Sequence, residues 1–110
     1  MAMTRFPCAY LRGEVELTNE REQHIAAHHP DLLPEHSRCI GETLADPEEI
    51  RRDGDYPNTR LFFRWYDDLR DGKYVVVAVV SAEPPDVRHW IVTAFMARKP
   101  PQGDLECKRL

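Results

Sequence analysis

The stretch TRLFFRWYDDLRDGKYVVVAVVS, residues 59–81, decides the fold class. Its two ends, residues 59–66 and 73–81, are rich in aromatic and β-branched residues, which favour β-strands. The segment DDLRDG between them suits a hairpin and is too short for the crossover that parallel strands need. Residues 75–80 are continuously apolar, which indicates a central strand covered on both faces. The stretch therefore predicts an antiparallel hairpin at the centre of a sheet.

The sequence that flanks this hairpin extends the sheet. Residues 88–97, RHWIVTAFMA, predict a third strand after the short loop AEPPDV. The segment ADPEEIRRDGDYPN, residues 45–58, predicts an edge strand or a turn before the hairpin. Residues 99–110, KPPQGDLECKRL, predict a flexible tail.

The N-terminal part predicts one short strand and then two helices. Residues 13–17, GEVEL, alternate in polarity and predict the strand. In TNEREQHIAAHH, Thr18 suits a helix N-cap, and Pro30 ends the helix. A second helix is predicted over residues 34–45. The sequence thus predicts an α+β fold, in which two N-terminal helices pack on a three- to four-stranded antiparallel sheet.

Composition limits the class of protein. The 110 residues suit a single domain over 1–110, and a net charge of -4 argues against tight, nonspecific binding to long nucleic acid. No apolar run approaches the roughly 20 residues of a membrane span, and the N-terminus lacks the apolar core of a signal peptide, so a cytoplasmic protein is expected. The widely spaced Cys8, Cys39 and Cys107 predict free thiols.

The segment EREQHIAAHHP, residues 20–30, holds three of the five histidines. On a helix, Arg21, His24 and His28 share one face because they are three, four and seven residues apart. Such a row of cationic and titratable side chains is either solvated surface or the wall of an anion site. His24 and His28 have the spacing of a zinc pair, with His36 and Asp31 as candidates for a third ligand. A metalloprotease would need Glu beside the first histidine, which this segment lacks, so no metal is predicted.

Strand alternation sorts the side chains of residues 59–66 onto two faces. One face is apolar and predicts the core side; it carries Leu61, Phe63 and Trp65. The other face interleaves two arginines with aromatic rings, which suits a surface that holds a phosphate and stacks a base, or an ordinary solvent face. That face carries Arg60, Phe62, Arg64 and Tyr66. Lys73, at the start of the next strand, is a further candidate cation.

The last predicted strand adds a hydroxyl. Alternation places His89, Ile91, Thr93 and Phe95 on one face, and Thr93 is the polar residue in the apolar part of that strand. A helix histidine, two arginines and this hydroxyl are the parts that RNA cleavage without a metal requires. A base removes the 2′-OH proton, an acid protonates the leaving oxygen, and cations stabilise the phosphorane.

The chain resembles the phage-associated nuclease domains of the barnase–EndoU–colicin–RelE (BECR) group. The resemblance runs over residues 14–98, through VELTNEREQHIAAHHPDL, IGETLADPEEI, TRLFFRWY, KYVVVAVV and WIVTAF in that order. It implies an endoribonuclease-like domain of toxin or phage-conflict type that needs no metal or cofactor, with RNA and a cognate inhibitor protein as partners. In that case His24, Arg60, Arg64 and Thr93 are the expected catalytic residues. The expected substrate-binding residues are Arg21, His28, Phe62, Tyr66 and Lys73.

A second function remains open beside this one. The acidic balance and the loops RRDGDYPN and AEPPD fit a small protein-interaction or antitoxin-like module without nuclease activity.

Overall fold

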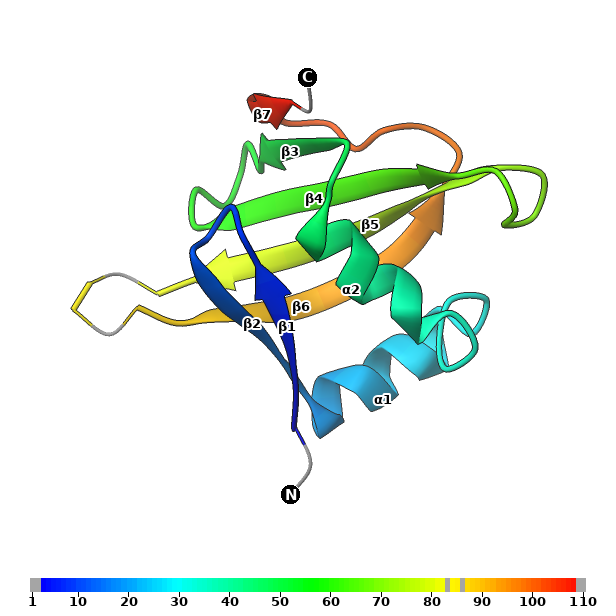
Figure 1. Cartoon of the computed structure of the whole chain (residues 1–110), viewed down its shortest axis with the longest axis horizontal. Helices are drawn as coiled ribbons and strands as arrows, with labels where there is room; N and C mark the ends of the chain where they lie inside the picture. Colours follow the sequence, from blue (N-terminus) through cyan, green and yellow to red (C-terminus); the bar gives the residue numbers. More distant parts are fainter. Residues whose placement is uncertain (1–2, 83, 86, 109–110) are drawn as a thin grey trace.

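The computed structural model describes residues 3–82, 84–85 and 87–108. The chain forms seven strands and two helices in these residues (Figure 1). In chain order they are β1 (Met3–Cys8), β2 (Gly13–Thr18), α1 (Asn19–His28), α2 (Ser37–Ala45), β3 (Glu49–Arg52), β4 (Thr59–Tyr66), β5 (Lys73–Ser81), β6 (His89–Ala97) and β7 (Asp104–Lys108).

All described strands belong to one mixed sheet with the order β1-β2-β6-β5-β4-β3-β7. Neighbouring strands are antiparallel except β2 and β6, which run parallel and pair where Glu16 lies opposite Trp90. The predicted fold class is therefore wrong: the fold is mostly sheet, and two strands, not one, precede the helices. The hairpin of β4 and β5 and the third strand β6 form the centre of the sheet.

The two outermost strands account for the difference. β1 has the sequence MTRFPC, which lacks a clear strand pattern, but it pairs with β2 along its whole length. β7 lies within the segment predicted as a tail and pairs with β3, so β3 is internal and not an edge strand. Gly103 permits this pairing, because a Cβ atom there would lie 2.5 Å from the carbonyl oxygen of Arg52.

The helices begin and end for local reasons. The Thr18 side chain caps α1 by accepting a hydrogen bond of 3.2 Å from the backbone N–H of Arg21, as the sequence predicts. The helix ends at His28, two residues before Pro30. α2 starts at Ser37, later than predicted, because the chain from 29 to 36 forms turns in which the His36 N–H bonds to the Leu32 carbonyl.

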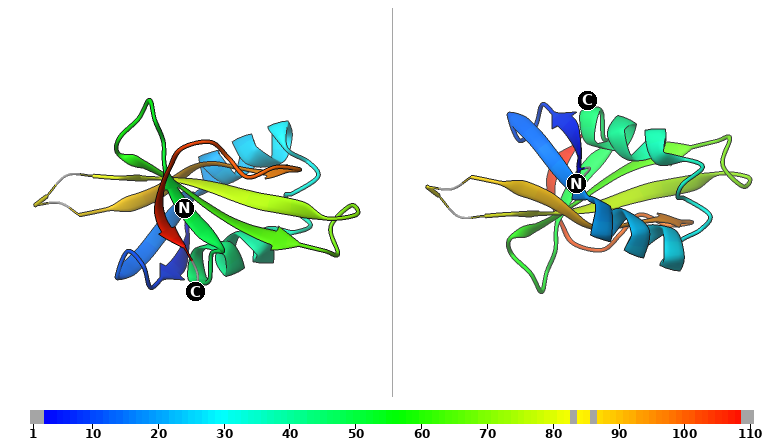
Figure 2. Two further views of the ribbon diagram at one scale, coloured as in Figure 1. Left: turned by 90° about the horizontal axis from the view of Figure 1, so that it is seen from above. Right: turned by 90° about the horizontal axis from the view of Figure 1, so that it is seen from below.

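The sheet has two different faces. α2 lies against the face turned toward the viewer in Figure 1, which we call the front face, and Figure 2 shows α1 set apart from α2, beside β6. Because directly paired residues point to the same side, the register assigns side chains to each face. The front face carries Arg60, Phe62, Arg64, Tyr66, Val75, Val77, Val79, Ile91 and Ala94. The back face carries Leu61, Phe63, Trp65, Tyr74, Val76, Ala78, Thr93 and Phe95.

The predicted core side of β4 is wrong. The main hydrophobic core lies under α2 and includes Phe62, which is fully buried, and Tyr66. The Tyr66 hydroxyl donates to Glu42 of α2 at 2.9 Å, which explains how a polar ring tip is accommodated in this core. On the back face Phe63 is also buried, but Trp65 is 38% exposed.

A β-bulge in β6 breaks the alternation that the sequence predicts. Ala78 pairs with Thr93, whereas the next residue, Val79, pairs with Ile91, so Val92 is an extra residue. As a result Ile91 faces the front, with the core, and Thr93 faces the back. The prediction that these two residues share a face is therefore wrong.

Candidate functional site

Helix α1 lies along the outer edge of β6. β2 pairs with β6 near Trp90 and then leads directly into α1, which continues beside β6 (Figure 1). The Arg21 guanidinium donates a hydrogen bond of 3.1 Å to the carbonyl of Val92, the bulge residue. At the other end of the helix, the rings of His29 and Phe95 are 5.8 Å apart. These two contacts fix α1 next to the part of β6 that carries Thr93.

Arg21, His24 and His28 form a row on α1, which we call the histidine row. His24 and His28 are exposed, and their ring centroids are 4.2 Å apart. Nδ1 of His28 lies 2.9 Å from the His24 carbonyl, to which only a protonated nitrogen can donate. Nε2 of His28 has no hydrogen-bond partner among the described residues and is available to a substrate.

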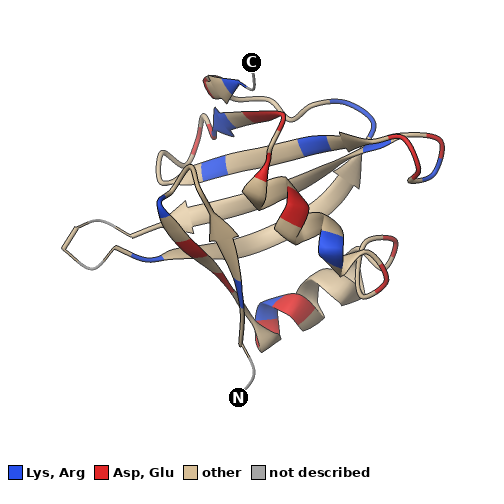
Figure 3. Cartoon of the chain, viewed as in Figure 1, with Lys and Arg blue, Asp and Glu red and all other residues tan. Residues whose placement is uncertain are grey.

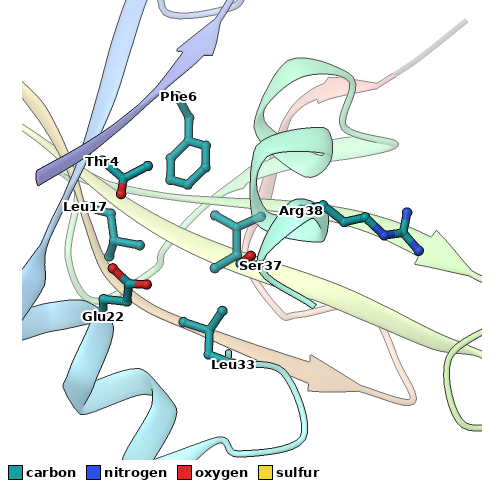
Figure 4. Close-up of a pocket in the computed structure, with 8 residues that line it drawn as sticks. Thr4, Phe6, Leu17, Glu22, Leu33, Ser37 and Arg38 are labelled. Carbon is teal, nitrogen blue, oxygen red and sulfur yellow. The ribbon is translucent and has the colours of Figure 1, made fainter. Parts of the chain in front are cut away.

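The electrostatic surroundings favour neutral His24. Desolvation, and then the positive charges of His28 and Arg21, lower the pKa of His24 below its ordinary value of 6.5. A neutral imidazole near pH 7 can accept a proton, which is what a general base must do. Glu22 is two residues from His24 and therefore projects from the other side of the helix, and it points toward β1 and α2 (Figure 4).

Arg60 belongs to a different group of side chains. Its Nε donates to Glu106 of β7 at 2.6 Å, and Arg52 and the Tyr10 hydroxyl donate to the same carboxylate at 2.7 and 2.5 Å. The Glu106 side chain is only 16% exposed. Burial alone would raise the pKa of Glu106, but the hydrogen bonds from Tyr10, Arg60 and Arg52 outweigh it and lower that pKa. Glu106 thus compensates the charge of Arg60.

Arg60 also connects these hydrogen bonds to strands β5 and β6. Nη1 of Arg60 donates to the Ser81 hydroxyl at 3.2 Å, and that hydroxyl lies 2.7 Å from Nδ1 of His89. Burial and the charge of Arg60 lower the pKa of His89. Because the Ser81 oxygen accepts from Arg60, its O–H can donate a hydrogen bond to Nδ1 of the neutral ring. We call Tyr10, Arg52, Arg60, Ser81, His89 and Glu106 the Glu106 network.

The remaining predicted site residues on the front face are engaged or covered. Phe62 is fully buried, so its ring cannot stack on a base in this conformation. Arg64 lies 3.6 Å from Asp46 and over the ring of Tyr66. The Lys73 ammonium donates to the carbonyl of Arg70 at 3.0 Å.

The structure therefore divides the predicted site. Arg21, His24 and His28 lie together on α1, and Arg21 bonds to Val92, the neighbour of Thr93 in β6. Arg60 and Arg64 lie on the opposite side of the sheet and do not join them. Residue patterns hold no signal for Glu106, which lies in the predicted tail, or for the Val92 carbonyl, which the bulge makes available to Arg21.

The described residues contain no group of three or more His, Cys, Asp or Glu side chains arranged to bind a metal ion. Neither α1 nor α2, the helices of the described chain, is long and apolar enough to cross a membrane.

In comparisons with known proteins, no family model matches this chain, and no curated protein and no solved structure is significantly similar to it. The resemblance to BECR nucleases therefore stays a prediction from the sequence.

Proposed function

We propose that the chain is an endoribonuclease-like domain that cleaves RNA without a metal ion at the histidine row. The observation that carries this proposal is the pair of exposed histidine rings, 4.2 Å apart, beside a guanidinium that is fixed to strand β6. Two adjacent imidazoles can exchange protons with a substrate near neutral pH, and an arginine beside them suits a phosphodiester.

The reaction follows from these groups. His24 takes the proton of a ribose 2′-OH, and the 2′-oxygen attacks the adjacent phosphorus. The bond from phosphorus to the 5′-oxygen breaks, and His28, protonated on both nitrogens, gives that oxygen a proton. The products are a 2′,3′-cyclic phosphate and a free 5′-OH. The guanidinium N–H groups of Arg21 that Val92 does not use stabilise the phosphorane, and the Thr93 hydroxyl orients the phosphate.

Charge distribution suggests that RNA binds weakly. In the view of Figure 3, basic and acidic residues are interspersed along the ribbon, and the net charge is -4. Few phosphate contacts are then available, so affinity should be modest and should fall as salt increases. We propose the cytoplasm as the place of action, with a cognate inhibitor protein as a second partner.

The test is cleavage of total RNA and tRNA in the presence of EDTA. The wild-type chain should cleave, and His24→Ala should reduce the rate by about 100-fold or more, the usual contribution of a general base. Gln23→Ala is the matched control, because Gln23 is the exposed neighbour of His24 on the same helix, and it should cleave like the wild type. Equal cleavage by wild type and His24→Ala would refute the proposed role of the row.

A noncatalytic interaction module is the second candidate function. It is favoured by apolar side chains that stand exposed on loops and at the sheet edge, among them Tyr56, 68% exposed, and Leu105 of β7, 58% exposed. If the wild type neither cleaves nor binds RNA across a range of salt, this candidate is the better one.

A further inference from the structure

A cavity of about 220 Å³ lies on the other side of α1, between that helix, α2 and the hairpin of β1 and β2 (Figure 4). Its walls are mainly apolar. Leu17, Leu33 and Ile40 form them with at most 3% exposure, and Phe6 of β1 completes them. At roughly 30 Å³ per water molecule, the cavity has the volume of about seven waters, which suits a small organic molecule.

Glu22 is the charged group directed into this cavity. Figure 4 shows its carboxylate beside Leu17, above Leu33. Within the described part of the chain, no side chain or backbone group forms a hydrogen bond or an ion pair with Glu22. Arg38 also lines the cavity, but its guanidinium extends away and pairs with Glu42 at 3.3 Å and Asp68 at 3.8 Å. The charge inside the cavity is therefore negative and uncompensated.

Two hydroxyl groups line the same cavity as this carboxylate. Thr4 of β1 and Ser37, the first residue of α2, both line the cavity. Neither hydroxyl has a hydrogen bond to another described residue, so both can accept one from a ligand. A carboxylate with two hydroxyl acceptors, above apolar walls, is complementary to an ammonium group that carries an apolar body.

We propose that this cavity binds a small primary amine with an aromatic or branched aliphatic body. The ammonium donates to Glu22 and to the hydroxyls of Thr4 and Ser37. The body lies against Leu33 and Ile40, where burial of its surface contributes most of the affinity. The site does not depend on the proposed RNA chemistry, because Glu22 and His24 lie on opposite sides of α1.

The probe is 2-phenylethylamine, with 2-phenylethanol as the neutral ligand of the same shape. Both are titrated into the full chain, and binding is followed by NMR. The amine should bind with a Kd on the order of 1 mM, as expected for about nine heavy atoms, and the alcohol should bind at least about tenfold more weakly. The shifts should cluster in β1, the first turn of α1 and the start of α2.

Glu22→Gln isolates the carboxylate while it preserves the size of the side chain. It should weaken binding of the amine about tenfold and leave binding of the alcohol unchanged, since only the charged interaction is lost. Glu20→Gln removes the same charge from an exposed position in the same turn and should bind the amine like the wild type. Equal affinity for amine and alcohol, unchanged binding to Glu22→Gln, or the absence of saturable binding would each overturn the proposal.

Discussion

The two sides of the sheet carry the same residue types in different environments. In the Glu106 network, on the front, Arg60 and His89 are partly buried. The Glu106 carboxylate and a hydroxyl hold Arg60 in place, and the same hydroxyl contacts His89. Along α1 and the back of β6, His24 and His28 are exposed, and they have no carboxylate partner within hydrogen-bonding distance in the described chain. Paired charges fix a structure, whereas unpaired titratable groups are available to a substrate.

This contrast changes the roles that we assign to Arg60 and Arg21. From the sequence, Arg60 is a phosphate clamp and Arg21 an accessory. In the structure, Glu106 compensates the charge of Arg60 at 2.6 Å, whereas the Arg21 side chain bonds within the described residues to the Val92 carbonyl and keeps further donors available. Substitutions on the front should therefore affect stability, and those in the histidine row should affect chemistry.

Phe62→Ala should give the largest loss of stability. The Phe62 ring is fully buried in the main core, and truncation of such a ring lowers the free energy of unfolding by about 3–5 kcal/mol. Trp65→Ala, on the back of the same strand, removes a larger ring that is 38% exposed and should lower stability by clearly less. Urea denaturation of both variants measures the difference, and equal losses would contradict the assignment of the faces.

Glu106→Gln should have the next largest effect. It leaves Arg52 and Arg60 without their shared carboxylate, and hydrogen bonds to charged groups contribute about 1.5–3 kcal/mol, so a loss of about 2 kcal/mol is expected. Glu14→Gln, at an exposed position of β2, is the control and should change stability by less than about 0.5 kcal/mol. If Glu106→Gln were as stable as the wild type, the Glu106 network would contribute no more to stability than ordinary surface charges do.

Gly72→Ala tests how the exposed Trp65 is held. Gly72 has φ +99°, and a Cβ atom there would clash with the Trp65 ring at 2.4 Å. We expect a loss of about 1–2 kcal/mol and a shift of Trp65 fluorescence, measured in a Trp90→Phe background. Gly54→Ala is the control, because a Cβ atom at Gly54 would have no neighbour within 4 Å.

The histidines on the two sides should respond differently to acid. The pKa of His89 is lowered in the fold, so below about pH 6.5 the unfolded chain binds a proton that the folded chain does not. The contribution of His89 to the free energy of unfolding is therefore fully present above that pH and is lost as the pH falls through the folded pKa. His89→Gln should flatten thermal stability between pH 7 and 5. The pKa of His24 is lowered as well, by desolvation and by the charges of His28 and Arg21, but His24 is exposed and these charges are screened by solvent, so His24→Gln should flatten the profile by less than His89→Gln.

The parts of the fold that sequence predicts well are those fixed by local chemistry. Thr18 caps α1, and β4 and β5 have the predicted bounds because their aromatic and β-branched residues favour strands. The outer strands are set by pairing and not by composition, so the polar segment of β7 gives no signal of its own. Both faces of β4 carry large rings, and alternation alone cannot say which face the helices cover.

The candidate site was predictable in the same partial way. Helical spacing places Arg21, His24 and His28 in one row, and the structure keeps them together. The relation of that row to the strands depends on the bulge at Val92, which moves Thr93 to the back, and on the packing of α2, which takes Phe62 and Tyr66 out of reach. Neither follows from residue spacing.

The most direct test of the central claim, that the histidine row and the back of β6 form the functional surface, is NMR mapping with a short single-stranded RNA. Its riboses are 2′-fluoro-substituted, so that no 2′-OH is present to attack. The claim predicts perturbed signals from Arg21 to His29 and from Val92 to Phe95, including the imidazole signals of His24 and His28. Perturbations confined to Arg60, Arg64 and α2, with the histidine row unchanged, would contradict it.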